Sequence, residues 1–580
     1  MIQLPGKSKI WTQPNISTVL GSLASTFNID PQTNLGKLRT TGMIQTTFEA
    51  TNTDMTDPPL KFVNYNGSIW TVAGTKVHKT AIGDDDPMDP FVVDAISGSP
   101  TTLSFSHSDI EAFNGRVYVT GVVASFGNLY RTNATTWTDL GALSSTGPFR
   151  LCAYANRLYI QVGSNEIHSM NTSETIATSG QYTIDFADNG TSNITFIKAG
   201  ADKIWVGMRT SDGQPGIIYE WDGSSNQATR SYKISARSPL SCVMKDDVPY
   251  VMDNQGRLLV FNGGAFVEVA RLPLFDKILE GSYGSEKWIH SNGMSLINGK
   301  VNMLIRNTLE DTSTPEFCMS GIWEYDERMG LYHKHSLSYT PIGTTTITSW
   351  GQGRLAKVGG LNEMRTGDTG AGANGYFLAG AETYLTATTS SCGVFINDYL
   401  DTTQKAGYIV TPELSGEGIS DIMQKVYANY RRLLASGDKI VVKYRTSKQE
   451  PTEMTITWTS TTTFTTTDSN MANYAVGDEV EITRGKGGGM CSHITVISNN
   501  AGTYTVTVDE THTGATSGTA TARFQKWIKA GSITDIVSAY KEFPIGLEAT
   551  WIQFKVFFLW TGKNEFEKLT LVHEPQQKPL

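Results

Sequence analysis

A short line of turn and strand residues recurs along the middle of the chain, about every 40–55 residues. It is clearest as Asn66-Gly67-Ser68-Ile69-Trp70 and returns as Asn114-Gly115-Arg116-Val117-Tyr118. Further copies lie at 156–159, 202–205 and 246–250, with weaker ones at 298–302 and 353–356. Asn-Gly and Asp-containing pairs supply the positive φ angles of tight hairpin turns. The apolar and aromatic residues that follow are typical of a strand with a buried face.

A second short sequence motif follows most of these turns and ends in another turn. Its clearest copy is Ile217-Ile218-Tyr219-Glu220-Trp221-Asp222-Gly223. Each unit therefore contains three or four short strands joined by hairpins, which is the signature of a β-propeller blade. The sequence predicts an all-β fold with a propeller of six or seven blades over residues 60–396. An irregular β-sandwich or a β-solenoid is the alternative, but the period drifts too far for a solenoid and the turn signal repeats too often for a sandwich.

The pattern changes after residue 396, as expected for a chain of 580 residues, which is too long for one core. Residues 438–446 alternate as a half-buried strand, and the apolar run 551–558 is its natural partner. We predict a β-sandwich platform made of 397–450 and 526–580. Residues 451–525 between them predict an inserted small β-barrel, with a strand at 503–509.

Two segments leave alternatives open. Residues 420–430 are compatible with a short helix or a strand. Residues 1–59 are polar and predict an N-terminal arm with a turn and a strand at 36–44. This arm is expected either to run along the propeller and close its ring, or to dock on a neighbouring subunit.

Charge and cysteine content limit the function classes. The net charge is -9 and no long basic run occurs, so stable nucleic-acid binding is not expected, although an acidic wall along which DNA slides is compatible. The 5 cysteines are far apart, so neither a disulfide scaffold nor a zinc ribbon is predicted, and Cys152 and Cys242 are expected to be buried thiols. The N-terminus has no apolar signal core, which predicts a soluble protein made in a cytoplasm.

Three local patterns suggest chemistry, but a structural interpretation is preferred for each. The loop 83–89 has four carboxylates but not the spacing of an EF-hand, so a solvated acidic turn is preferred over a calcium site. The Gly-rich loop 484–490 joins two strands and lacks a GK[ST] ending, which favours a hairpin loop over a phosphate cradle. His333 and His335 fall on one side of a strand, where weak exposure on a β surface is preferred over a shared metal.

No catalytic, cofactor-binding or metal-binding residue is therefore predicted, and the chain is not expected to be an enzyme. A serine-hydrolase elbow, GxSxG, is missing from the sequence. The sequence also gives no way to pair two carboxylates as a glycosidase requires.

The divergent Asn-Gly-x-Ile-Trp units followed by a β platform resemble the tail nozzle, or tail tubular, proteins of short-tailed bacteriophages. Residues 27–39, Phe-Asn-Ile-Asp-Pro-Gln-Thr-Asn-Leu-Gly-Lys-Leu-Arg, are similar to stretches that open phage virion proteins. The resemblance covers most of the chain in layout, and its motifs are generic.

The resemblance implies a structural virion protein that forms a ring of six copies at the distal end of a phage tail. Such a ring continues the DNA channel, holds the genome until ejection, and contacts adaptor and fibre proteins. We expect assembly in the host cytoplasm, transient contact with genomic DNA, and subunit contacts through the exposed strands of 397–450 and 526–580. The alternative is a receptor- or glycan-binding tail protein that uses the propeller face, and a glycan-cleaving propeller enzyme is the third hypothesis.

Overall fold

The computed structural model describes five short strands before residue 45 and most of the chain from residue 55 onward. The described ranges are 9–12, 25–27, 29–30, 39–40, 43–44, 55–81, 91–100, 103–104, 107–123, 126–143, 147–163, 165–176, 193–210, 214–272, 288–306, 308–309, 316–317, 320–327, 330–337, 355–364, 376–384, 390–396, 405–411, 413–415, 421–431, 433, 437–485, 491–509, 517–534, 538–560 and 566–575. Regular structure within them is β-strand apart from one 3-10 helix, and they contain no helix that is long and apolar enough to cross a membrane.

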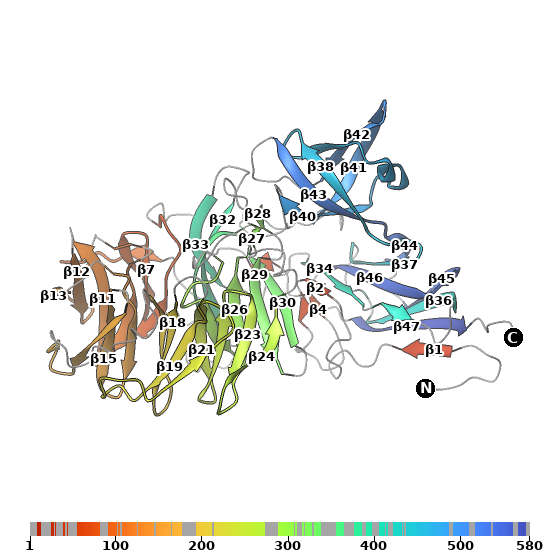
Figure 1. Ribbon diagram of the computed structural model, residues 1–580. Helices are drawn as coiled ribbons and strands as arrows, with labels where there is room; N and C mark the ends of the chain where they lie inside the picture. The colour runs from red at the N-terminus through yellow and green to blue at the C-terminus, as the bar shows by residue number, and fades with distance from the viewer. Residues whose placement is uncertain are drawn as a thin grey trace.

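In the described part of residues 62–396, seven antiparallel sheets of three or more strands follow one another (Figure 1). The first two consist of β6 (Phe62–Tyr65), β7 (Ser68–Ala73), β8 (Lys76–Ala81) and β9 (Val92–Val93), then β10 (Ile110–Phe113), β11 (Arg116–Val123), β12 (Phe126–Thr132) and β13 (Trp137–Ala142). The third and fourth consist of β14 (Leu151–Tyr154), β15 (Arg157–Val162) and β16 (Glu166–Asn171), then β17 (Asn193–Ala199), β18 (Ile204–Arg209), β19 (Ile217–Trp221) and β20 (Arg230–Lys233).

The remaining three sheets complete the series. The fifth contains β21 (Pro239–Lys245), β22 (Val248–Asp253), β23 (Arg257–Phe261) and β24 (Phe266–Arg271). The sixth contains β25 (Met294–Ile297), β26 (Lys300–Ile305), β29 (Gly321–Asp326) and β30 (Gly330–Leu337), with the hairpin β27 (Thr308–Leu309) and β28 (Glu316–Phe317) beside it in the sequence. The seventh contains β31 (Leu355–Met364), β32 (Tyr376–Tyr384) and β33 (Ser390–Ile396).

The first strands of these sheets form a closed ring. Each of β6, β10, β14, β17, β21 and β25 contacts the first strand of the next sheet, and β31 contacts β6 again. Radial sheets around a closed ring of inner strands are the defining arrangement of a β-propeller. The predicted all-β propeller is therefore confirmed.

The repeated turn residues have the backbone conformation that the sequence predicted. Asn66 and Gly67 have φ angles of 50° and 69°, and Asn114 and Gly115 have φ angles of 46° and 66°. Two consecutive positive φ angles define the type I′ turn, whose twist matches that of the two strands it joins. The turn chemistry thus fixes the first hairpin of these blades.

Residues of the two repeated sequence motifs contact one another between neighbouring blades. Tyr159 follows the turn of the third sheet, and Trp221 ends a strand of the fourth; their ring centroids lie 5.3 Å apart, edge to face. The Tyr159 hydroxyl also donates a hydrogen bond of 2.8 Å to the carbonyl of Gly223. Because Trp221 is fully buried, this contact stabilises the stacking of one sheet on the next.

The chain after the propeller forms two further sheets and a barrel (Figure 1). One sheet contains β34 (Lys405–Val410), β46 (Trp551–Trp560), β37 (Lys439–Thr446) and β44 (Ile528–Ile533), and β35 (Leu414–Ser415) also pairs with β46. The second sheet contains β47 (Phe566–Pro575), β36 (Asp421–Tyr430) and β45 (Tyr540–Ala549). The pairing of β37 with β46 confirms the predicted partnership, and β36 shows that 420–430 contains a strand rather than a helix.

The segment 451–525 contains a closed six-stranded barrel. Its strands are β38 (Thr452–Trp458), β39 (Thr463–Thr466), β40 (Glu479–Gly485), β41 (Cys491–Asn500), β42 (Thr503–Val508) and β43 (Gly518–Gln525), and the 3-10 helix η3 (Ser469–Asn473) lies between β39 and β40. Its own apolar core includes Trp458, Phe464 and Phe524.

Strands from the N-terminal segment join sheets of the same chain. The strand β1 (Lys9–Thr12) pairs with β47, and β2 (Ser25–Phe27) pairs with β34. The strand β5 (Met43–Ile44) adds in parallel to β30 at the outer edge of the sixth sheet, and β3 (Ile29–Asp30) pairs with β4 (Arg39–Thr40). Of these described strands, β1 and β2 join the platform, β5 joins the propeller, and β2 also contacts β30 of the propeller.

Candidate functional site

The three patterns that suggested chemistry gain no support as sites. The acidic loop 83–89 lies outside the described residues, as does most of the Gly-rich loop 484–490. Within the described part of the chain, no three His, Cys, Asp or Glu side chains are grouped to hold a metal ion.

The prediction that His333 and His335 are weakly exposed on a β surface was wrong. Both side chains are buried, with exposures of 0% and 7%. A ring nitrogen of His333 lies 3.1 Å from the carbonyl of Ser320, and the His335 ring lies 5.3 Å from the ring of Phe377 in the next sheet. Burial lowers the pKa of His333 to about 4, so this ring is neutral at pH 7. The pairing register shifts between Ile322 and Trp323, and the two rings have different neighbours: His333 packs on Trp323 of its own sheet and His335 on Phe377 of the next one.

A polar cluster lies at the centre of the propeller, where the inner strands would otherwise present apolar side chains. The Lys61 ammonium, just before β6, lies 2.6 Å from the Glu111 carboxylate on β10 and donates to the Leu151 carbonyl at 3.2 Å. Burial opposes a charge on Lys61, but Asp109 and Glu111 raise its pKa above the usual value. These three neighbouring blades are thus joined by one charged pair at the axis.

A second set of contacts joins blades that are not adjacent. The Asn292 amide accepts a hydrogen bond from Lys198 at 3.5 Å and donates one to Asp109 at 3.4 Å. Lys198 belongs to the fourth sheet, Asn292 precedes the sixth, and Asp109 precedes the second. Because these blades lie on different sides of the ring, the contacts cross the propeller axis and restrict the channel along it.

Two thiols lie beside this cluster. Cys152 on β14 and Cys242 on β21 are buried and free, as the sequence predicted. Burial raises the pKa of each thiol to about 12, so both are protonated at pH 7 and poor nucleophiles. We name Lys61, Asp109, Glu111, Lys198 and Asn292, with these two thiols, the axial cluster.

Sequence reasoning missed the axial cluster, although a signal was present. Glu111 lies three residues before the first turn residue, Asn114, and Lys198 directly follows the apolar pair Phe196-Ile197. A charged residue inside the first strand of a blade is unexpected unless it faces the axis, because both faces of that strand pack against neighbouring sheets. These charged residues point to the axis only once the innermost strand of each unit is known.

A second buried charged group joins the platform to the barrel. The Lys555 ammonium on β46 forms an ion pair with the Glu479 carboxylate on β40, and their side chains are only 4% and 9% exposed. Lys443 lies directly opposite Lys555 in the sheet. Burial and the Lys555 charge together lower the pKa of Lys443. Burial alone would raise the pKa of Glu479, but Lys555, His493 and Lys443 bring it below its ordinary value.

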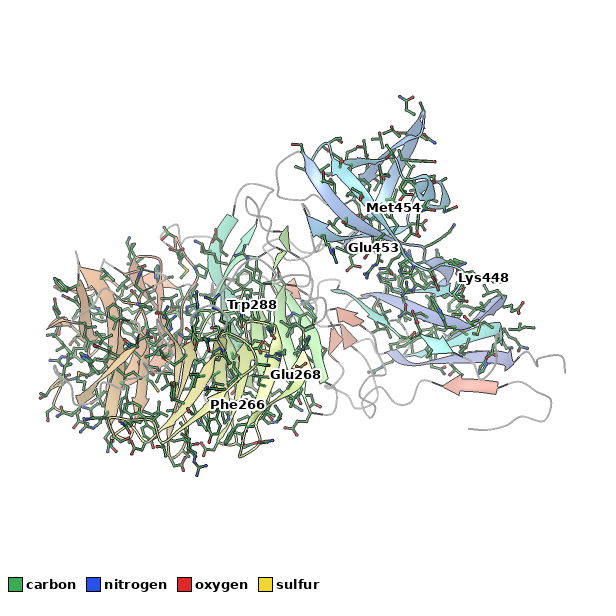
Figure 2. The ribbon with its side chains drawn as sticks, in the orientation of Figure 1. Phe266, Glu268, Trp288, Lys448, Glu453 and Met454 are labelled. Carbon is green, nitrogen blue, oxygen red and sulfur yellow. The ribbon has the colours of Figure 1, made fainter. Side chains whose placement is uncertain are left out.

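Aromatic rings surround these cations. The Lys555 ammonium lies 5.5 Å from the Trp527 ring and 5.2 Å from the Phe557 ring, and Lys443 lies 5.0 Å from Phe557. Figure 2 labels Lys448, at the platform end of the segment that leads into the barrel, and Glu453 and Met454, at the start of the barrel. Cation–π contacts of this kind add to the stabilisation that the ion pair gives the contact between platform and barrel.

The same strand contacts the propeller. Phe557 on β46 and Val441 on β37 belong to one buried cluster with Trp288, Met303 and other apolar residues of the fifth and sixth sheets. The opposite face of β46, including Phe554 and Phe558, packs in the platform core. Both faces of β46 are therefore buried, and this strand contacts propeller, platform and barrel.

Comparison with known proteins gives a limited result. No protein family and no curated protein matches the chain. Similar solved structures include the WD40 β-propeller domain of Doa1, with 11% identity, a TM-score of 0.38, and coverage of 61% of this chain and 96% of that one. A computationally designed protein, Ika8, has 12% identity, a TM-score of 0.35, and coverage of 66% and 98%. BamB from Moraxella catarrhalis has 12% identity, a TM-score of 0.31, and coverage of 58% and 92%. Similarity at this level carries no argument about function.

Proposed function

We propose that this protein is a structural subunit of a bacteriophage tail, in which six copies form the distal nozzle ring. The ring continues the DNA channel, retains the genome until ejection, and anchors fibres, with an adaptor protein on its other side. The subunit is divided into an N-terminal arm (1–59), a seven-bladed propeller (60–396), a β-sandwich platform (397–450 with 526–580) and an inserted barrel (451–525). In this proposal it works as a scaffold in the virion and catalyses no reaction.

The observation that carries the proposal is the burial of both faces of β46. A ring that holds pressurised DNA needs subunits whose domains do not move independently. Phe557 packs against the propeller, Phe554 packs inside the platform, and Lys555 pairs with Glu479 of the barrel. Strand β2 adds a further connection, because it pairs with β34 of the platform and contacts β30 of the propeller. This continuity favours a rigid building block over a set of tethered binding modules.

The DNA path in this proposal lies between subunits rather than through a propeller. Contacts from Lys198 through Asn292 to Asp109 cross the propeller axis, which leaves no passage for a duplex there. The net charge of -9 on each copy gives a ring wall that repels DNA, which prevents the genome from adhering as it leaves.

We assign the subunit contacts to the exposed strands of the platform. Tyr540 at the start of β45 is 63% exposed, which is unusual for a large aromatic side chain at a sheet edge. Deletion of 526–580 would abolish incorporation into the ring, but it would also remove β44 to β47 and thus much of the platform core. A single exposed substitution tests the contact without this complication.

The test compares Tyr540→Asp with Val267→Asp, a matched change at an exposed apolar residue of the propeller strand β24. Purified full-length variants are examined by sedimentation velocity and negative-stain electron microscopy. We expect wild type and Val267→Asp to form rings and Tyr540→Asp to remain monomeric. Equal ring formation by both variants would refute the assignment of the platform edge.

The alternative function is binding of a host receptor or surface glycan by the propeller face. The Lys61 and Glu111 side chains at the axis keep exposures of 17% and 20%, so polar groups there are accessible to small solutes. Against this alternative, the repeated aromatics Trp70, Trp205 and Trp221 are buried and cannot stack on sugars. Incubation with host surface polysaccharide separates the hypotheses: binding without cleavage favours the receptor, cleavage favours an enzyme, and no binding leaves the structural proposal.

A further inference from the structure

We propose that the axial cluster of the propeller binds a small oxyanion, with the Lys198 ammonium as its main ligand. Lys198 lies on the innermost strand of the fourth sheet, inside the closed ring of strands. Its one hydrogen bond to the described residues is the long contact of 3.5 Å to the Asn292 carbonyl oxygen. Within this described set, no carboxylate lies within ion-pair distance of it.

The carboxylates of the cluster have other partners. Glu111 is paired with Lys61 at 2.6 Å. Asp109 accepts the backbone N–H groups of Ile110 at 2.9 Å and Leu151 at 2.8 Å. Lys198 therefore forms no direct ion pair within the cluster, and Asn292 separates it from Asp109, the carboxylate that attracts it. Lys198 is only partly exposed, so its ammonium is removed from much of its hydration without gaining an ion pair, and a bound anion would stabilise its charged form.

The lowered pKa of Lys198 reflects the same imbalance. Burial is the main cause, and the neighbouring Lys61 charge adds to it. A bound anion would reverse both effects, because it replaces water and offsets the repulsion between the two lysines. We therefore expect the anion to bind the protonated form of Lys198.

Other groups at the axis suit a small oxygen anion. The Ser291 hydroxyl, next to Asn292 in the sequence, is buried and has no hydrogen-bond partner among the described residues. Lys61 uses its ammonium for Glu111 and Leu151, which leaves one of its three N–H groups for a further acceptor. One unpaired charge with hydroxyl and ammonium donors favours a small ligand of the phosphate or carboxylate type. The partial exposure of Lys61 and Glu111 shows that solvent reaches this level of the axis.

The test measures thermal unfolding of the full chain as sodium phosphate is increased, with sodium chloride adjusted to keep ionic strength constant. The variants are Lys198→Met, Lys198→Arg and the control Lys203→Met. Lys203 lies in the same blade but is already paired with Glu220 at 3.3 Å. We expect a saturable rise in Tm for wild type, Lys198→Arg and Lys203→Met, and none for Lys198→Met.

Lys198→Met keeps the aliphatic volume and removes an unpaired charge, so without phosphate its Tm is expected to equal or exceed that of wild type. If this variant fails to fold, equilibrium dialysis of wild type with radiolabelled phosphate decides the question, with one phosphate per chain expected. The proposal is overturned if wild type shows no saturable rise, if Lys198→Met responds as wild type does, or if dialysis finds no bound phosphate.

Discussion

Replacing Glu479 by Gln is expected to loosen the contact between platform and barrel by about 3–5 kcal/mol. The change leaves the Lys555 ammonium in a site where it is only 4% exposed and where Lys443 lies directly opposite. Removal of one partner from a buried ion pair typically costs about 3–5 kcal/mol.

Hydrogen exchange measured by mass spectrometry on peptides from β37, β40 and β46 reports the free energy of opening this contact. At pH 7 we expect exchange in the Glu479→Gln variant to be about a hundredfold to several thousandfold faster than in wild type, since each 1.4 kcal/mol is a factor of ten. The control is Glu453→Gln, because Glu453 has a 51% exposed side chain and pairs with Arg523 at the barrel surface. An exposed pair contributes about 0–1 kcal/mol, so little change is expected there.

The pH dependence provides a second check on the same reasoning. In wild type the pKa of Glu479 is lowered, so its contribution to stability is present above the pKa of the unfolded chain and is lost as pH falls below about 4.5. Exchange in Glu479→Gln that equals wild type at pH 7 would refute the assignment of this pair.

Four further substitutions test the propeller. Gly115→Ala places a Cβ in open space at φ 66° and is expected to lower the free energy of unfolding by about 1–2 kcal/mol. Gly321→Ala places a Cβ 2.1 Å from the His335 carbonyl oxygen and should lower it by about 3 kcal/mol or more. Equal Tm values for the two variants would contradict this difference. Since the pKa of His333 is lowered to about 4, wild type should lose about 3 kcal/mol as pH falls from 6.5 to 4, and urea titrations should find this loss absent from His333→Gln. Trp221→Ala removes a fully buried ring and should cost about 3–5 kcal/mol by the same titration, with a cost below 1 kcal/mol contradicting its role between blades.

The propeller was predictable because its signals are local. Asn-Gly turns dictate positive φ angles within two residues, and the apolar line after each turn dictates which side of the strand is buried. The pairing of β37 with β46 was also predictable, although about a hundred residues separate them, because both strands carry long alternating apolar runs.

The sites were not predictable because they depend on contacts between distant segments. Asp109 and Asn292 lie 183 residues apart, and nothing in either local sequence indicates the other. Glu479 and Lys555 belong to different domains, and each reads as an ordinary charged residue on an alternating strand. The exposure of His335 was misjudged for the same reason, since Phe377 in the next blade packs against its ring.

The measurement that tests the central proposal most directly is negative-stain electron microscopy of the purified protein and of its parent particle. The proposal predicts rings of six copies with a central channel, located at the distal tip of the tail. Isolated monomers, or protein found only on peripheral fibres, would contradict the nozzle role and favour receptor binding by the propeller.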